Sequence, residues 1–148
     1  MGVRTFEHIG IVVDDLERVA NFFELLGFDR AEPFHVQGSW ADRVNGLDGT
    51  DGDMIFVTAP DGSGAIELTR FRAPLDDTPR EGDGPANRHG LRHLAYRVDE
   101  LAPLLERLAA AGYGLVREAV NYEDVWLVCY IRGPEGLIIE LGERLDGG

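Results

Sequence analysis

The chain has 148 residues, of which 44% are hydrophobic and 28% are charged, and its formal net charge is −13. This is ordinary globular composition, and the length suits one compact domain or two half-sized modules that share a core. The negative charge argues against nucleic acid or an anionic membrane as a partner. No apolar run approaches the roughly 20 residues that cross a bilayer. The single cysteine, Cys129, excludes an internal disulfide, so we expect a cytoplasmic protein.

One sequence pattern occurs twice, at residues 7–16 and again at 92–101. In both places a histidine stands near the start of an apolar strand, and a valine five residues later is followed by an aspartate. The two histidines are His8 and His93. An internal repeat of this kind indicates the architecture before any single motif does.

A helix is predicted after each of these strands, over 16–26 and 101–111, because apolar residues recur there at helical spacing. Candidate N-caps are Asp14 or Asp15 for the first helix and Asp99 for the second. Each helical stretch ends at a glycine, which suits the left-handed residue that often follows a helix.

The two halves also end alike. A turn of proline, an acidic residue and glycine leads into a strand that carries Ile-Glu-Leu, at residues 60–68 and again at 134–141. Each turn follows another apolar strand, 54–58 in the first half and 126–131 in the second. The order in each half is therefore strand, helix and about three strands, the βαβββ unit.

These patterns predict an α+β fold of two tandem βαβββ modules that form one compact domain. The first module covers residues 1–72 and the second covers 91–148. Residues 73–90 between them are rich in proline, glycine and charge, which is typical of an exposed linker.

Strand alternation places four polar side chains on sheet faces whose reverse is continuously apolar. They are His8, Glu67, His93 and Glu140. Two carboxylates alone in a cavity would repel, and one would take up a proton at considerable cost. A divalent cation removes that cost, and mixed nitrogen and oxygen ligands suit nickel, cobalt, zinc, manganese or iron(II). Because the histidine and glutamate recur at equivalent points of both repeats, we expect a pseudo-twofold to bring both pairs to one ion.

The other two histidines lack that support: His35 is expected in a loop and His89 in the linker, both structural or solvent-exposed. Arg97 shares the ligand face, and its two interpretations are a contact with a substrate anion and a surface ion pair. Three aromatic residues are candidates for pocket walls or for the core. They are Trp40, Tyr122 and Trp126.

Residues 7–16 and 22–28 resemble the first module of the glyoxalase/bleomycin resistance/dioxygenase proteins, the vicinal oxygen chelate superfamily. Residues 93–99 and 134–141 resemble the second module, so the resemblance covers nearly the whole chain. It implies a cupped mixed sheet around a metal whose ligands come from the first and last strands of each module. These ligands would be His8, Glu67, His93 and Glu140.

The ligand set is similar to that of bacterial glyoxalase I. The resemblance implies an isomerase or lyase that binds two vicinal oxygens of a small-molecule substrate and moves a proton through an enediolate-type intermediate. Glu140 or Glu67 would be the base, and we favour Glu140. The alternatives are a methylmalonyl-CoA-epimerase-like enzyme, an iron(II) ring-cleaving dioxygenase and a non-catalytic protein that binds a small molecule such as an antibiotic. Family members often dimerise, so a homodimer is expected.

Overall fold

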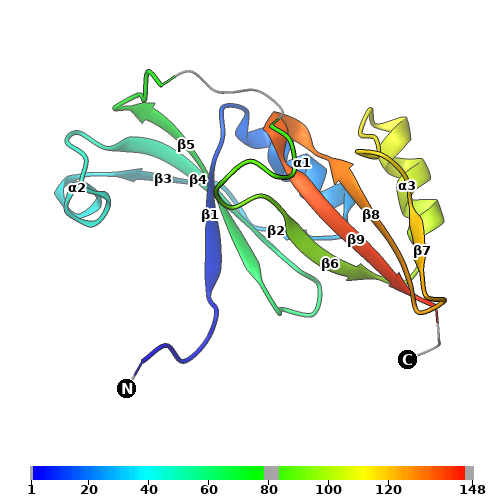
Figure 1. Ribbon diagram of the computed structural model, residues 1–148. Helices are drawn as coiled ribbons and strands as arrows, with labels where there is room; N and C mark the ends of the chain where they lie inside the picture. The colour runs from blue at the N-terminus through cyan, green and yellow to red at the C-terminus, as the bar shows by residue number, and fades with distance from the viewer. Residues whose placement is uncertain (1, 79–83, 146–148) are drawn as a thin grey trace. The chain divides into compact units, whose positions relative to one another are not determined.

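The computed structural model describes residues 2–78 and 84–145. The chain forms two compact units, Met1–Pro79 and Arg80–Gly148. Each unit contains a mixed β-sheet and helical segments (Figure 1), which confirms the predicted α+β class and the βαβββ order. The predicted linker includes residues 79–83, which lie outside the described part of the chain. None of the helices formed by the described residues is long and apolar enough to span a membrane.

The sheet of the first unit has β1 at its edge, paired in parallel with the last strand, β5. The strand order is β1-β5-β4-β2, and β3 also pairs with β4. All pairs except β1 with β5 are antiparallel. The elements are β1 (His8–Val12), α1 (Leu16–Leu25), β2 (Asp29–Arg30), β3 (Phe34–Gln37), α2 (Ser39–Asn45), β4 (Asp51–Thr58) and β5 (Ala65–Ala73).

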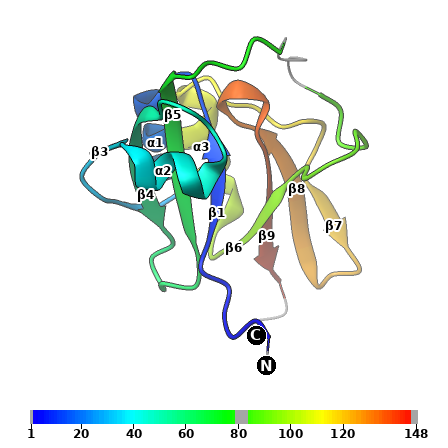
Figure 2. The ribbon, with the colours of Figure 1, turned by 90° about the vertical axis from the view of Figure 1, so that its left-hand side faces the viewer.

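The second unit repeats this arrangement with fewer elements. Its strand order is β6-β9-β8-β7, again with the first and last strands parallel, and Figure 2 shows these four strands side by side. The elements are β6 (Leu94–Val98), α3 (Leu101–Ala110), β7 (Val120–Tyr122), β8 (Trp126–Arg132), the 3₁₀ turn η1 (Pro134–Gly136) and β9 (Ile138–Arg144).

Alternation along the strands divides each sheet into an apolar face and a face that carries the polar candidates. Ile66 and Leu68 on β5, and Ile139 and Leu141 on β9, are at most 1% exposed. In each unit the helix supplies further fully buried residues to the core, such as Phe23 on α1 and a leucine pair on α3. Burying one such side chain contributes about 1.5–3 kcal/mol, which makes a shift of register by one residue prohibitive.

The two helices begin differently, although the sequence predicts the same aspartate cap for both. Asp15 caps α1 as expected, since its carboxylate accepts a hydrogen bond of 3.0 Å from the Arg18 amide. The expectation for Asp99 is wrong. Glu100 is the N-cap of α3 and makes no side-chain cap, whereas the Leu101 amide donates to Glu143 of β9 at 2.7 Å. Glu143, from a strand distant in sequence, therefore replaces a local N-cap side chain at the start of α3.

The helix α2 is not predicted by the sequence. It has only seven residues, ends at Gly46 with φ of 75°, and lies next to β3 (Figure 1). Asp42 of α2 fixes the turn that follows, because its carboxylate accepts hydrogen bonds from the Gly49 and Thr50 amides at 3.1 and 2.7 Å. Hydrogen bonds from loop amides to a side chain therefore stabilise this segment. Such bonds leave no periodic pattern of apolar residues in the sequence.

Leu141→Ala should lower the free energy of unfolding by about 2–5 kcal/mol, because it leaves a cavity under α3 in a fully buried position. The same substitution at Leu91, which is 70% exposed, is the matched control and should change stability by less than about 0.5 kcal/mol. Urea unfolding followed by circular dichroism measures both. Equal midpoints for the two variants would contradict the assignment of the β9 faces.

Candidate functional site

The first candidate pair, His8 and Glu67, lies on the polar face of the first sheet. The His8 Nε2 atom is 3.5 Å from Glu67 Oε2, and the side chains are 35% and 23% exposed. Nδ1 of His8 contacts the carboxylate of Glu7. A histidine whose Nδ1 is held by a carboxylate presents Nε2 in a fixed direction, which is how metal-binding histidines are commonly oriented.

The sheet fixes this pair through its register. Gly10, two residues after His8 on the same face, pairs with Glu67 across the parallel strands. Phe56 is the antiparallel partner of Glu67, and its ring lies edge-on to His8 with 5.5 Å between centroids. The hydroxyl of Thr69 donates to the Glu67 carboxylate at 3.3 Å. The pair therefore lies on an apolar floor that the strand pairing positions.

The second unit contains the same arrangement around His93 and Glu140. His93 Nε2 is 3.2 Å from Glu140 Oε2, and the side chains are 37% and 32% exposed. Ala95, again two residues after the histidine, pairs with Glu140 across the parallel strands. Tyr130 is the antiparallel partner of Glu140, and its ring centroid lies 5.0 Å from that of His93.

The difference between the pairs is the hydroxyl of Tyr130, which has no counterpart on Phe56. This hydroxyl lies near the Glu140 carboxylate. Burial raises the pKa of Tyr130, and the neighbouring Glu140 carboxylate raises it further. The phenol therefore stays protonated at neutral pH, with its O–H group beside Glu140.

The spacing of the donor atoms in each pair suits a metal ion. Two ligands about 2.1 Å from an ion are about 3.0 Å apart at a right angle and about 3.4 Å apart at a tetrahedral angle. The observed 3.2 and 3.5 Å lie close to this range. Among residues 2–78 and 84–145, no three or more histidine, cysteine, aspartate or glutamate side chains form a group that could hold a metal. Each unit by itself brings together two of the four candidate ligands.

A cavity of about 360 Å³ opens on the polar face of the second sheet, beside Glu140. Arg97, Tyr122 and Trp126 line it, so three of the residues that the sequence left between pocket, core and surface share one cavity. Trp40 is 61% exposed on α2 and does not line it.

Cys129 is not part of this site. It is buried on β8 with its thiol free, and its position on the helix side of the sheet follows from its pairing with Leu141. Burial raises the pKa of the thiol, so it remains protonated and offers neither a thiolate ligand nor a nucleophile at neutral pH.

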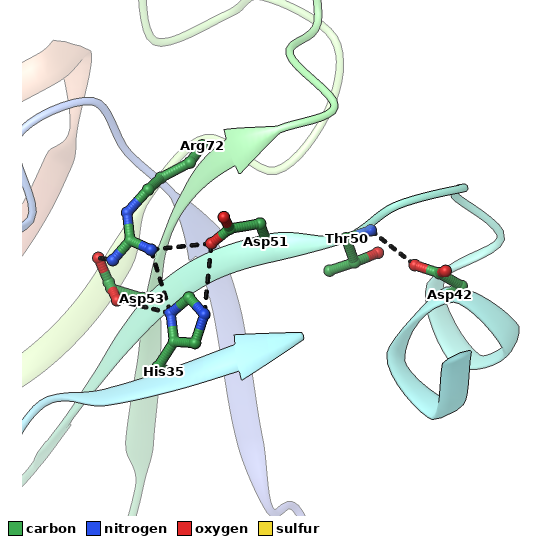
Figure 3. Close-up of polar contacts among 6 residues, drawn as sticks. All are labelled: His35, Asp42, Thr50, Asp51, Asp53 and Arg72. Carbon is green, nitrogen blue, oxygen red and sulfur yellow. Dashed lines mark hydrogen bonds and ion pairs between the residues drawn. The ribbon is translucent and has the colours of Figure 1, made fainter. Parts of the chain in front are cut away.

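His35 lies in β3, not in the loop that the sequence predicts, and it belongs to a charged cluster of residues from β3, β4 and β5. Figure 3 shows it between Asp51 and Asp53, with Arg72 reaching both carboxylates. Its Nδ1 is 3.1 Å from Asp53 and its Nε2 is 3.4 Å from Asp51. His89, in contrast, is exposed in the irregular segment before β6.

The cluster holds together three strands at an irregularity in the sheet. The pairing of β4 with β5 shifts between Asp51 and Gly52, which leaves Arg72 without a register partner on β4. A side chain at Gly52 would place Cβ 2.9 Å from the Arg70 carbonyl oxygen, so the strands approach too closely there for any larger residue. Asp51 and Asp53 therefore have a structural role in this sheet.

Comparison with known proteins identifies relatives of the chain and of its fold. The sequence profile of the glyoxalase/bleomycin resistance protein/dioxygenase superfamily matches residues 7–130. The structure is similar to that of a glyoxalase family protein from Bacillus cereus, with 34% identity, a TM-score of 0.93, and 99% of this chain and 97% of that chain covered. A comparison with curated proteins finds no match.

Two more distant structures share the fold. A glyoxalase family protein from Enterococcus faecalis has 23% identity and a TM-score of 0.63, with 92% of this chain and 94% of that chain covered. The fosfomycin resistance protein FosX from Listeria monocytogenes has 15% identity and a TM-score of 0.62, with 97% and 95% covered.

The charged cluster predicts a pH-dependent contribution of Asp53 to stability. The hydrogen bond to His35, and then Arg72, lower the pKa of Asp53 in the folded chain. A carboxyl whose pKa falls on folding stabilises the fold above its unfolded pKa of about 4, and the contribution disappears as the pH falls through the folded pKa. Asp53→Asn should therefore be less stable than the wild type at pH 7, by less than about 1 kcal/mol.

Thermal unfolding at pH 7, 5, 4 and 3 measures this contribution. The difference between Asp53→Asn and the wild type should shrink below pH 4, while Asp77→Asn, an exposed aspartate outside the cluster, should match the wild type throughout. A difference that stays constant with pH would show that the charge of Asp53 does not matter.

Proposed function

Because the chain belongs to the glyoxalase/bleomycin resistance protein/dioxygenase superfamily, we propose that it is a metal-dependent isomerase or lyase. Its substrate would be a small molecule with two neighbouring oxygen atoms. Members of this superfamily typically bind a divalent metal ion, and many are enzymes. The proposed ligands of a single ion are His8, Glu67, His93 and Glu140.

The observation that carries this proposal is the repetition of one His–Glu geometry in both units. In each unit the glutamate pairs with the residue two positions after the histidine, and Nε2 and Oε2 are 3.5 or 3.2 Å apart. Fold stability does not explain why the His–Glu pair is repeated, because a partly exposed pair of this kind contributes at most about 1 kcal/mol to the free energy of unfolding. A single ion with four protein ligands would account for two such pairs.

A bound nickel, cobalt, zinc, manganese or iron(II) ion would supply Lewis acidity toward the two substrate oxygens. The two histidines would donate through Nε2 as neutral imidazoles, and Glu7 would keep the His8 ring in the required orientation by holding Nδ1. The carboxylates of Glu67 and Glu140 would complete the set and balance the charge of the ion.

Glu140 is the proposed base. It would take a proton from the carbon beside one substrate oxygen and return it to the neighbouring carbon, so that no other reactant is consumed. Two features favour Glu140 over Glu67: it lines the cavity of the second unit, and the protonated hydroxyl of Tyr130 lies near it. A hydrogen bond from that hydroxyl would orient the carboxylate while the proton moves.

The expected setting of this activity is a homodimer in the reducing cytoplasm. The free and buried Cys129 suits that compartment. The small-molecule substrate agrees with a net charge of −13, which disfavours nucleic acid and anionic membranes.

Protein purified without added metal should contain one transition-metal ion per chain. His8→Ala and His93→Ala should each reduce the bound metal at least tenfold, because either change removes one of four ligands. His89→Ala, which removes an exposed histidine before β6, should keep the full amount. Inductively coupled plasma mass spectrometry on dialysed protein measures all four samples.

Two results would overturn the shared site. Two ions per chain, with each histidine variant retaining one, would mean that the pairs bind separate ions. Full occupancy in both His8→Ala and His93→Ala would mean that the metal lies elsewhere.

Glu140→Gln should lower kcat about 100-fold or more, because the amide cannot accept the proton. The hemithioacetal of methylglyoxal and glutathione is the first substrate to assay, by the formation of the thioester. Glu67→Gln should lower kcat less, and Glu106→Gln on the exposed side of α3 should have no effect. If Glu67→Gln abolishes turnover while Glu140→Gln retains it, Glu67 is the base.

A further inference from the structure

The cavity beside Glu140 contains a positively charged group on a largely aromatic wall. Arg97 on β6 lies above the indole of Trp126, with its guanidinium carbon 5.1 Å from the ring centroid. Arg144 on β9 approaches the same ring at 5.5 Å. Tyr122 of β7 pairs with Trp126 across the antiparallel strands and completes this wall. Two guanidinium groups therefore approach one ring, in a chain whose net charge is −13.

Arg97 makes no ion pair with any described residue. Its contact with Trp126 positions the planar guanidinium without using its N–H donors in a carboxylate pair, as a salt bridge would. Such a group suits a carboxylate, which it can bind through two parallel hydrogen bonds. Of the two interpretations left open by the sequence, a surface ion pair and a contact with a substrate anion, the second therefore fits the cavity.

The indole of Trp126 packs against Gly142 on β9. Gly142 pairs with Arg97 on one side and with Val128 on the other. A Cβ at Gly142 would lie 3.6 Å from Trp126 Cε3, so the indole lies directly over the glycine backbone. The indole therefore lies against the backbone of Gly142 and beneath the guanidinium of Arg97.

The register fixes the backbone positions of Arg97 and of the candidate metal ligand Glu140. Arg97 pairs with Gly142 and Ala95 pairs with Glu140, so the two rows are separated by two residues along parallel strands. Two residues of a strand span about 6.6 Å. The backbone positions of Arg97 and Glu140 are therefore about 6.6 Å apart along the strand direction.

From these contacts we infer that the cavity is a subsite for a flat, apolar anion, and that Arg97 is the residue that binds its carboxylate. The substrate class is a small aryl carboxylate whose ring lies along Trp126 and Tyr122. The inference that the same substrate also carries the two reacting oxygens rests on the proposed function. The anion subsite itself depends only on residues of the second unit.

The test uses Trp126 as its own reporter. Trp40→Phe removes the exposed tryptophan of α2 and leaves Trp126 as the sole indole. In this background, benzoate should change the Trp126 fluorescence saturably, both with metal and after treatment with a chelator. Benzyl alcohol and benzylammonium, which have the same ring without the negative charge, should bind at least tenfold more weakly.

Arg97→Gln should weaken benzoate binding about tenfold or more and leave benzyl alcohol binding unchanged. Arg107→Gln, an exposed arginine on α3, is the matched control and should bind benzoate like the parent. Circular dichroism verifies that each variant is folded, and calorimetric titration repeats the affinities without relying on fluorescence.

Equal benzoate affinity in Arg97→Gln and in its parent would overturn the assignment of Arg97. Absence of saturable benzoate binding in the parent, or equal binding of benzyl alcohol, would overturn the anion subsite. Neither result depends on metal content. A chain that binds benzoate through Arg97 but holds no metal would keep this inference while the proposed function fails.

Discussion

The parallel pairing of the first strand with the last strand of each unit is the constraint on which the rest depends. In the first unit this pairing joins residues nearly sixty positions apart in sequence, Gly10 with Glu67, and in the second it joins Ala95 with Glu140. The same contact buries the alternate residues under the helix. Core and polar face are therefore specified together, because a shift of one residue would expose Ile66 and Leu68 and bury Glu67.

The elements that follow a hydrophobic period were predictable from the sequence. The spacing of apolar residues placed α1 and α3 to within one residue at their carboxyl ends, and the repeat indicated which strands carry the histidines and glutamates. Alternation also assigned His8 and Glu67 to one face, which their 3.5 Å contact confirms within the first unit. These features depend on local pattern and on burial, which the sequence records directly.

The features that the sequence did not reveal depend on contacts between distant residues. The short helix α2 is held by Asp42 and the turn amides, not by an apolar stripe. His35 appeared to lie in a loop because β3 is short and mostly exposed, and its strand exists only through pairing with β4. The position of Arg97 over Trp126 requires the register of three strands at once. A sequence can list such residues as candidates, but their juxtaposition comes from the sheet.

The capping of α3 by Glu143 has a mechanical consequence for the ligand face. Glu143 and Glu140 are on the same strand with opposite orientations, and Glu143 binds the amide of Leu101 on the helix side. The amino end of α3, where the helix dipole is positive, therefore binds β9 on its apolar face. This contact at Glu143 is three residues from Glu140, which faces the cavity. A force that pulled Glu140 outward along its strand would also have to separate a charge from a helix terminus. The unit thereby gains resistance to displacement at the residue where a reaction would need constant geometry.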